Sequence, residues 1–140
     1  MKIKVEYPKP QQKLAVIQQG TGKYTLEYPG IFNDVFSKDF IAMPDVDDIE
    51  EIRFNRQRTI HWRLSLKDAE KTEKLSQEIL DKLKNEHLKL QEAITKENNS
   101  ITKSILKAFS FNFNQPDLKH IYESDNEISI INWGMTDDTG

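Results

Sequence analysis

The chain has 140 residues, of which 36% are hydrophobic and 31% are charged, and it carries a formal net charge of −3 and no cysteine. This length fits one domain with a single core, whereas the acidic balance argues against binding to nucleic acid through bulk positive charge. The absence of cysteine excludes disulfides, thiol nucleophiles and thiolate metal sites.

The N-terminal segment contains no targeting pattern. The stretch MKIKVEYPKP breaks into charge and proline too early for a signal peptide. No apolar run in the chain approaches the roughly 18 residues that a membrane span needs. We therefore expect a cytoplasmic protein without a membrane partner.

The first 66 residues are expected to form mainly strands. Ile3, Val5 and Tyr7 share one face of a strand at the start of the chain, and Lys2 and Lys4 share the other.

Two further strands are predicted at 13–19 and 23–28, joined by a hairpin at the glycines between them. After Pro29-Gly30, the apolar spacing over 31–40 predicts a short helix.

All four arginines lie in RFNRQRTIHWR, residues 53–63, directly after the acidic stretch DVDDIEE at 45–51. Alternation over 59–66 predicts a half-buried strand with Trp62 on its inner face. A second strand at 51–54 would complete a hairpin over 50–66.

Pairing in this hairpin would place Glu51 opposite Arg63, and Arg53 opposite His61. Ion pairs of this kind would give the clustered arginines a purely structural role. Two arginines at the tip, Arg56 and Arg58, would remain without a local acidic partner.

Residues 67–97 contain no glycine or proline, which predicts a long amphipathic helix beginning near Ser65 or Asp68. Its apolar stripe has the 3-4 spacing of a coiled coil over about two heptads, running through Leu80, Leu83, His87, Leu90 and Ile94. At Asn98-Asn99 the chain either turns in a helical hairpin or continues as one bent helix. We favour a break, because asparagines are weak helix formers, with Ser100 capping a second helix.

The C-terminal part predicts a β-hairpin over 118–134, turning at Asp125-Asn126, and then a polar tail at 135–140. With helices over 67–110, residues 1–140 read as a single α+β domain. We expect an antiparallel sheet of about five to seven strands. The long helix, the shorter second helix and the short helix of the N-terminal half would pack on it.

No motif predicts a catalytic, cofactor or metal site. The histidines, His61, His87 and His120, share no ligand spacing. The acidic stretch at 45–51 lacks the spaced ligands and central glycine of a calcium loop, and no phosphate loop or nucleophile elbow is present. The sequence therefore favours a protein that is not an enzyme and carries no cofactor. The alternative is a small enzyme on the outward face of the 50–66 hairpin, with His61 as a general base near Glu51.

Binding is better supported, because arginine and tryptophan are enriched at interface hot spots. The predicted partner-binding residues are Arg56, Arg58, Trp62, Arg63 and His61. The neighbouring acidic stretch would repel a nucleic-acid backbone but not a mixed-charge protein surface.

We therefore expect a protein-interaction or assembly module that binds a protein partner. Self-association as a homodimer through the long helix is a second route, if its apolar stripe is wider than one chain covers. A nucleic-acid binder using Arg56 and Arg58 is the remaining alternative.

Overall fold

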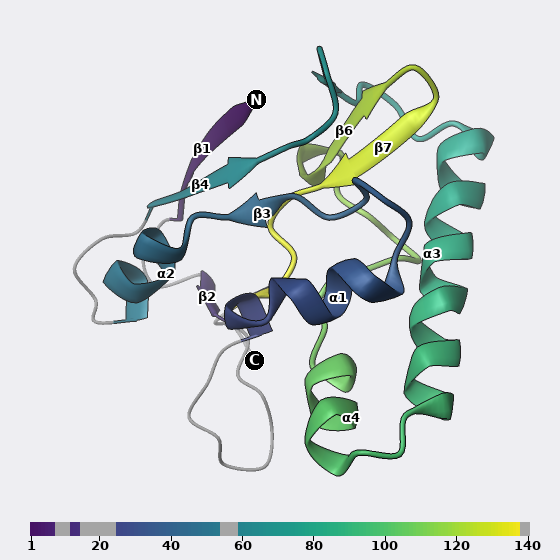
Figure 1. Cartoon of the computed structure of the whole chain (residues 1–140). Helices are drawn as coiled ribbons and strands as arrows, with labels where there is room; N and C mark the ends of the chain where they lie inside the picture. Colours follow the sequence, from purple (N-terminus) through teal and green to yellow (C-terminus); the bar gives the residue numbers. More distant parts are fainter. Residues whose placement is uncertain (8–11, 15–24, 54–58, 138–140) are drawn as a thin grey trace.

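A computed structural model describes residues 1–7, 12–14, 25–53 and 59–137 (Figure 1). The α+β class predicted from the sequence is confirmed. The strands are β1 (Lys2–Glu6), β2 (Gln12–Leu14), β3 (Met43–Pro44), β4 (Thr59–Arg63), β5 (Glu70–Lys71), β6 (Ile121–Ser124), β7 (Glu127–Ile130) and β8 (Met135–Asp137). The helices are α1 (Pro29–Val35), α2 (Val46–Arg53), α3 (Gln77–Lys96) and α4 (Ser100–Lys107), with 3₁₀ turns η1 (Thr25–Glu27) and η2 (Leu118–His120).

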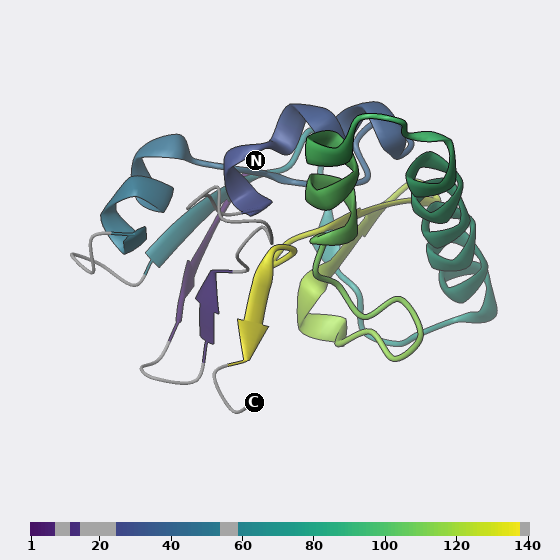
Figure 2. The same ribbon diagram turned by 90° about the horizontal axis from the view of Figure 1, so that it is seen from below.

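The described strands form small antiparallel sheets rather than one continuous sheet. Their orders are β1-β4-β3, β2-β8 and β5-β6-β7. The first and third sheets are joined where Ile41 bridges Ile130 in parallel, with the Ile130 N–H donating to the Phe40 carbonyl at 2.7 Å. Figure 2 shows α3 on one side of the molecule and β1, β2 and β4 on the other.

The N-terminal strand is confirmed, and the short helix predicted at 31–40 is confirmed as α1 over 31–35 but not over 36–40. The strand predicted at 23–28 is wrong over 25–27. Those three residues form the 3₁₀ turn η1. Thr25 and Leu26 are both buried, which a half-exposed strand does not allow for neighbours that point to opposite faces. Of the strand predicted at 13–19, residues 13 and 14 lie in β2, and 15–19 are outside the described residues.

The hairpin predicted over 50–66 is wrong, because residues 46–53 form helix α2. Asp47 and Asp48 lie in the first turn, where the positive end of the helix dipole favours carboxylates. The side chain of Asp45 accepts from the Asp47 N–H at 3.3 Å. Ile49 and Ile52, three residues apart, pack toward the core, so the alternation seen in the sequence was part of a helical period.

Strand β4 therefore pairs with β1 and β3, at the centre of its sheet. Arg63 lies opposite Lys2 on one side and opposite Met43 on the other. Glu51 faces Arg63 in neither strand pair, so the predicted cross-strand pairs of the hairpin do not form.

The long helix begins later than predicted, at Gln77, because Ser76 caps it by accepting from the Ile79 N–H at 3.2 Å. The segment before it contains β5. The predicted break is confirmed: α3 ends at Lys96, and Asn99 rather than Ser100 caps α4 by accepting from two backbone N–H groups.

The apolar stripe of α3 is covered by the same chain. Leu83 is fully buried and Leu90 is 6% exposed, whereas Leu88 on the solvent side is 51% exposed. The remaining stripe residues, Leu80, His87 and Ile94, are half-buried. None of the helices in the described parts of the chain is long and apolar enough to cross a membrane.

The terminal hairpin β6–β7 is confirmed, and its turn is Asp125-Asn126, with φ of 47° and 67°. Positive φ at both central residues is the conformation that suits a two-residue hairpin. The first residues of the predicted polar tail instead form β8, which pairs with β2. Before β8, Gly134 has φ of +78°, and a Cβ there would lie 2.8 Å from Leu26 Cδ2.

The core is built around aromatic side chains. Trp62 and Trp133 are fully buried with ring centroids 6.0 Å apart. The indole of Trp133 donates to the Ala42 carbonyl at 2.8 Å. The indole of Trp62 donates to Tyr7 Oη at 2.9 Å, and Tyr7 in turn donates to the side-chain oxygen of Asn132. Each buried polar group of the tryptophans is therefore satisfied.

Candidate functional site

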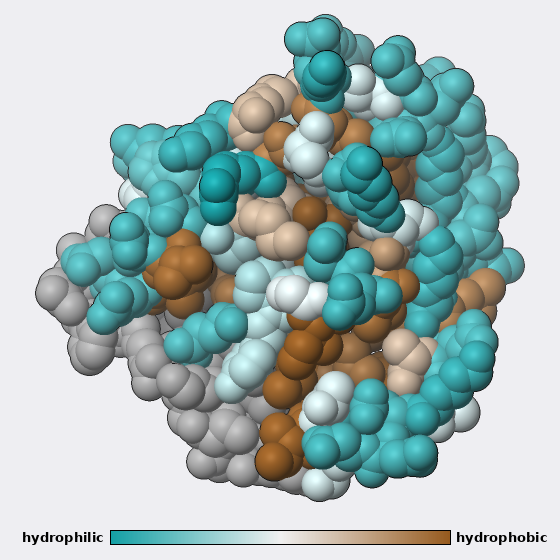
Figure 3. All heavy atoms as spheres, viewed as in Figure 1, coloured by the Kyte–Doolittle hydropathy of each residue, from teal (hydrophilic) through white to brown (hydrophobic). Residues whose placement is uncertain are grey.

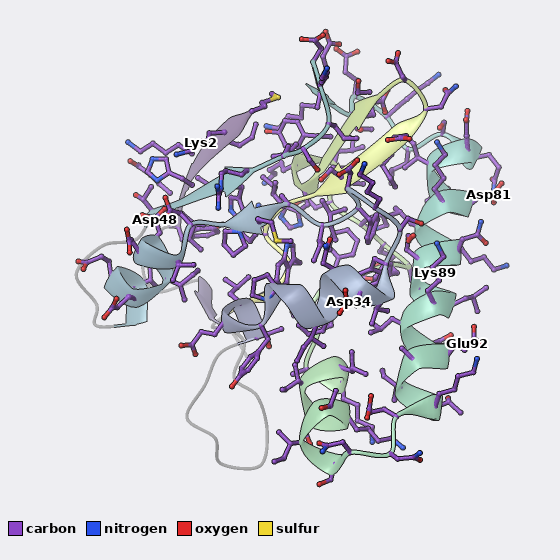
Figure 4. All side chains as sticks on the ribbon, viewed as in Figure 1. Lys2, Asp34, Asp48, Asp81, Lys89 and Glu92 are labelled. Carbon is purple, nitrogen blue, oxygen red and sulfur yellow. The ribbon has the colours of Figure 1, made fainter. Side chains whose placement is uncertain are left out.

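The outward side of strands β1 and β4 gathers positive charge. The register places Lys2 opposite Arg63 and Lys4 opposite His61. Directly opposed residues point to the same side of a sheet, so these four side chains form one surface, which we call the basic face. Figure 4 shows Lys2 and Asp48 together on this side of the molecule, away from Lys89 on α3.

The basic face is open to solvent. Lys2, Lys4 and Arg63 are exposed, and His61 is half-buried. Hydrophilic residues cover the surface over β1 in the upper left of Figure 3. The alternate residues point inward: Ile60 and Trp62 of β4 are both at 0% exposure, and Ile3 and Val5 of β1 are partly buried against the core. The sheet thus has one buried and one solvated side, as antiparallel sheets commonly do.

Like charges oppose each other on the basic face. Directly opposed like charges destabilise a strand pair. Neither Lys2 nor Arg63 makes an ion pair with any residue that the structure describes, whereas Lys4 lies 3.9 Å from Glu6 on its own strand. Lys2 and Arg63 are therefore neighbouring cations that form no ion pair within the described part of the chain.

His61 interacts with Asp48 of helix α2. Its Nδ1 lies 2.9 Å from Asp48 Oδ2, and the same carboxylate oxygen accepts from the His61 backbone N–H at 2.7 Å. The Asp48 side chain is 13% exposed and the His61 side chain 40%. This double contact fixes both the imidazole and the start of α2 against β4.

The five predicted partner-binding residues separate in the structure. Arg63 and His61 lie on the basic face. Trp62 points to the other side and belongs to the core, as the alternation of the strand predicts. Arg56 and Arg58 lie outside the described residues.

Sequence reasoning missed three members of this site, namely Lys2, Lys4 and Asp48. Alternation in the first strand had already placed both lysines on its polar face. The missing information was that β1 pairs with β4, a contact between segments about sixty residues apart. The position of Asp48 depended on helix α2, which was not predicted from the sequence.

A serine, a lysine and a glutamate meet where the chain leaves α1 and touches α3. The buried Glu86 carboxylate accepts from the Ser37 N–H at 3.0 and 3.2 Å, and Lys89 Nζ lies 3.1 Å from Glu86 Oε1 and contacts the Ser37 hydroxyl. An ammonium that donates to a carboxylate has no lone pair with which to take a proton from serine. The cluster therefore holds two elements together and does not activate Ser37.

The remaining catalytic and metal hypotheses gain no geometric support. Neither of the two cavities described along α3 is lined by His61 or Glu51. The ring of His87 stacks on Phe113 with centroids 4.6 Å apart. Across the described ranges, no three histidine, aspartate or glutamate side chains are grouped so as to hold a metal ion.

Comparison with known proteins gives no family for this chain: no family model, no curated protein and no solved structure matches it. The assignment of function therefore depends on the geometry of the basic face.

Proposed function

We propose that the chain is a non-enzymatic interaction module that binds an acidic surface of a protein partner through the basic face. The register that sets Lys2 beside Arg63 and Lys4 beside His61 is the observation that supports this proposal. Lys2 and Arg63 are opposed cations that form no ion pair with a described residue, and such a pair becomes favourable when a partner supplies carboxylates.

A protein partner suits this surface better than a nucleic acid does. Glu6 lies at one end of the same face, and Asp47 and Glu50 are exposed on the adjoining helix α2. A phosphate backbone carries regularly repeated negative charge and would meet these carboxylates. A folded or extended protein segment can place its acids only where the cations lie.

The proposal is tested with a fluorescently labelled peptide of alternating glutamate and serine, by fluorescence anisotropy. We expect saturable binding that weakens by about tenfold or more between about 0.05 and about 0.5 M salt, because screening removes the attraction. The triple variant Lys2→Gln/Lys4→Gln/Arg63→Gln should lose this binding.

A matched control separates the basic face from net charge. Lys74, Lys84 and Lys107 are exposed elsewhere on the chain, and replacing all three with glutamine changes the net charge equally. This control variant should bind the peptide like the unmodified chain. Equal loss of binding in both variants would refute a localised site, and tighter binding of a DNA oligonucleotide of the same formal charge would favour the nucleic-acid alternative.

A further inference from the structure

A second charged surface of opposite sign lies between α3 and the β6–β7 hairpin. It is a cavity of about 510 Å³, lined by two lysines and by six carboxylates, those of Asp68, Glu70, Glu78, Glu123, Asp125 and Glu127. The lining thus has a formal excess of four negative charges, compared with −3 for the whole chain. We call this cavity the acidic groove.

Three carboxylates of the acidic groove form no ion pair with any residue that the structure describes. Glu78 lies 3.9 Å from Lys82, and Glu123 accepts from the Thr72 hydroxyl at 3.0 Å. The carboxylates of Glu70, Asp125 and Glu127 are exposed and bond to no side chain in the described ranges. A cation of another molecule can therefore bind these carboxylates at a small desolvation cost.

The two charged surfaces lie apart in the fold. Figure 1 shows β1 and β4 on one side and the hairpin beside α3 on the other. No ion pair among the described residues joins the basic face to the acidic groove, since Lys2 and Arg63 pair with no described residue. Lys2 and Arg63 on one surface, and Glu70, Asp125 and Glu127 on the other, thus present complementary charges that no ion pair among the described residues neutralises.

We infer that the partner of the basic face is a second copy of this chain, which it meets at the acidic groove. This inference rests on the proposed function, because it names the partner of the same face. Lysine and arginine side chains are long enough to enter a concave acidic surface while the flat sheet stays outside. The contact joins two different surfaces, so a pair of copies together keeps one free face and one free groove.

Sedimentation of the full chain tests this inference. At about 0.05 M salt the average mass should exceed that of the monomer and should rise with concentration; at about 0.5 M it should return to the monomer value. The basic-face variant Lys2→Gln/Lys4→Gln/Arg63→Gln should be monomeric at low salt. The groove variant Glu70→Gln/Asp125→Asn/Glu127→Gln should also be monomeric.

Mixing the two variants gives the sharpest result. The basic-face variant has an intact groove, and the groove variant has an intact basic face. An equimolar mixture should therefore form a dimer and nothing larger. Circular dichroism first establishes that both are folded. If either triple variant fails to fold, Arg63→Gln and Glu127→Gln replace them in the same design.

The outcomes separate this inference from the proposed function. A chain that binds the acidic peptide but stays monomeric at low salt, or a mixture that does not associate, would overturn the second-copy partner and leave the interaction module standing. Self-association that persists in the groove variant would place the acceptor surface elsewhere and also overturn it. A chain that neither binds the peptide nor self-associates would overturn both.

Discussion

The two sides of strand β4 differ in burial and in charge. On the inner side, Ile60 and Trp62 are completely buried, and the indole hydrogen of Trp62 has a partner in Tyr7. On the outer side, Arg63 is exposed beside another cation. A single strand thus has a buried apolar side and an outer side on which Arg63 lies opposite Lys2 without an ion pair to any described residue.

Truncating a residue of the inner side should have the largest effect on the free energy of unfolding. Trp62→Ala should lower the free energy of unfolding by about 3–5 kcal/mol, because it leaves a cavity and removes the donor to Tyr7. Urea unfolding measures the loss. Peptide binding per folded molecule should stay unchanged, and a loss below about 1 kcal/mol would contradict the assigned core.

Tyr7→Phe tests the polar part of the inner side. Without the hydroxyl, the Trp62 indole and the Asn132 side chain lose their shared partner, and the free energy of unfolding should fall by about 1–2 kcal/mol near neutral pH. Urea unfolding at a series of pH values measures this difference.

Tyr7→Phe should also change how the free energy of unfolding depends on pH in alkaline solution. Burial raises the pKa of the Tyr7 hydroxyl, and the hydrogen bond from Trp62 opposes that rise only in part. The unfolded phenol titrates near about pH 10 while the folded one stays neutral, so the unfolded state binds fewer protons and stability falls as pH rises above about 10. Tyr7→Phe should lack this component, and an unchanged alkaline slope would argue against the buried phenol.

Changing the outer side should have the smallest effect on folding. Lys2→Gln/Lys4→Gln/Arg63→Gln should leave the free energy of unfolding within about 0.5 kcal/mol, with a slight gain from relieved repulsion. Thermal unfolding at low and high salt measures it. Destabilisation by more than about 1 kcal/mol would mean that the cations hold the sheet together, and the contrast between the two sides would fail.

Local patterns predicted the parts of this fold that depend on near neighbours. The two-residue turn at Asp125-Asn126 and the break before α4 follow from residue types within a few positions. Burial of Trp62 followed from alternation in its own strand.

Features that depend on distant contacts were not predictable in this way. The pairing of β1 with β4 brings together residues whose sequence neighbours give no sign of it. Ile52 and Phe54 fit a period of two, whereas Ile49 and Ile52 fit a period of three to four, and residues 46–53 form a helix. The polar side of one strand, which is half of the basic face, was therefore predictable from the sequence. The strand pairing that completes the basic face was not.

Gly134 has a consequence for how this sequence can change over evolutionary time. Its backbone conformation disfavours side chains, and Leu26 occupies the space that a Cβ would need. A mutation at this position would require Leu26 to shift, and it would strain the backbone that leads into the last strand. Compensating changes at two distant positions would therefore have to arise together. Related chains should therefore vary freely at positions 2, 4 and 63 according to their partners and keep glycine at 134 regardless of partner.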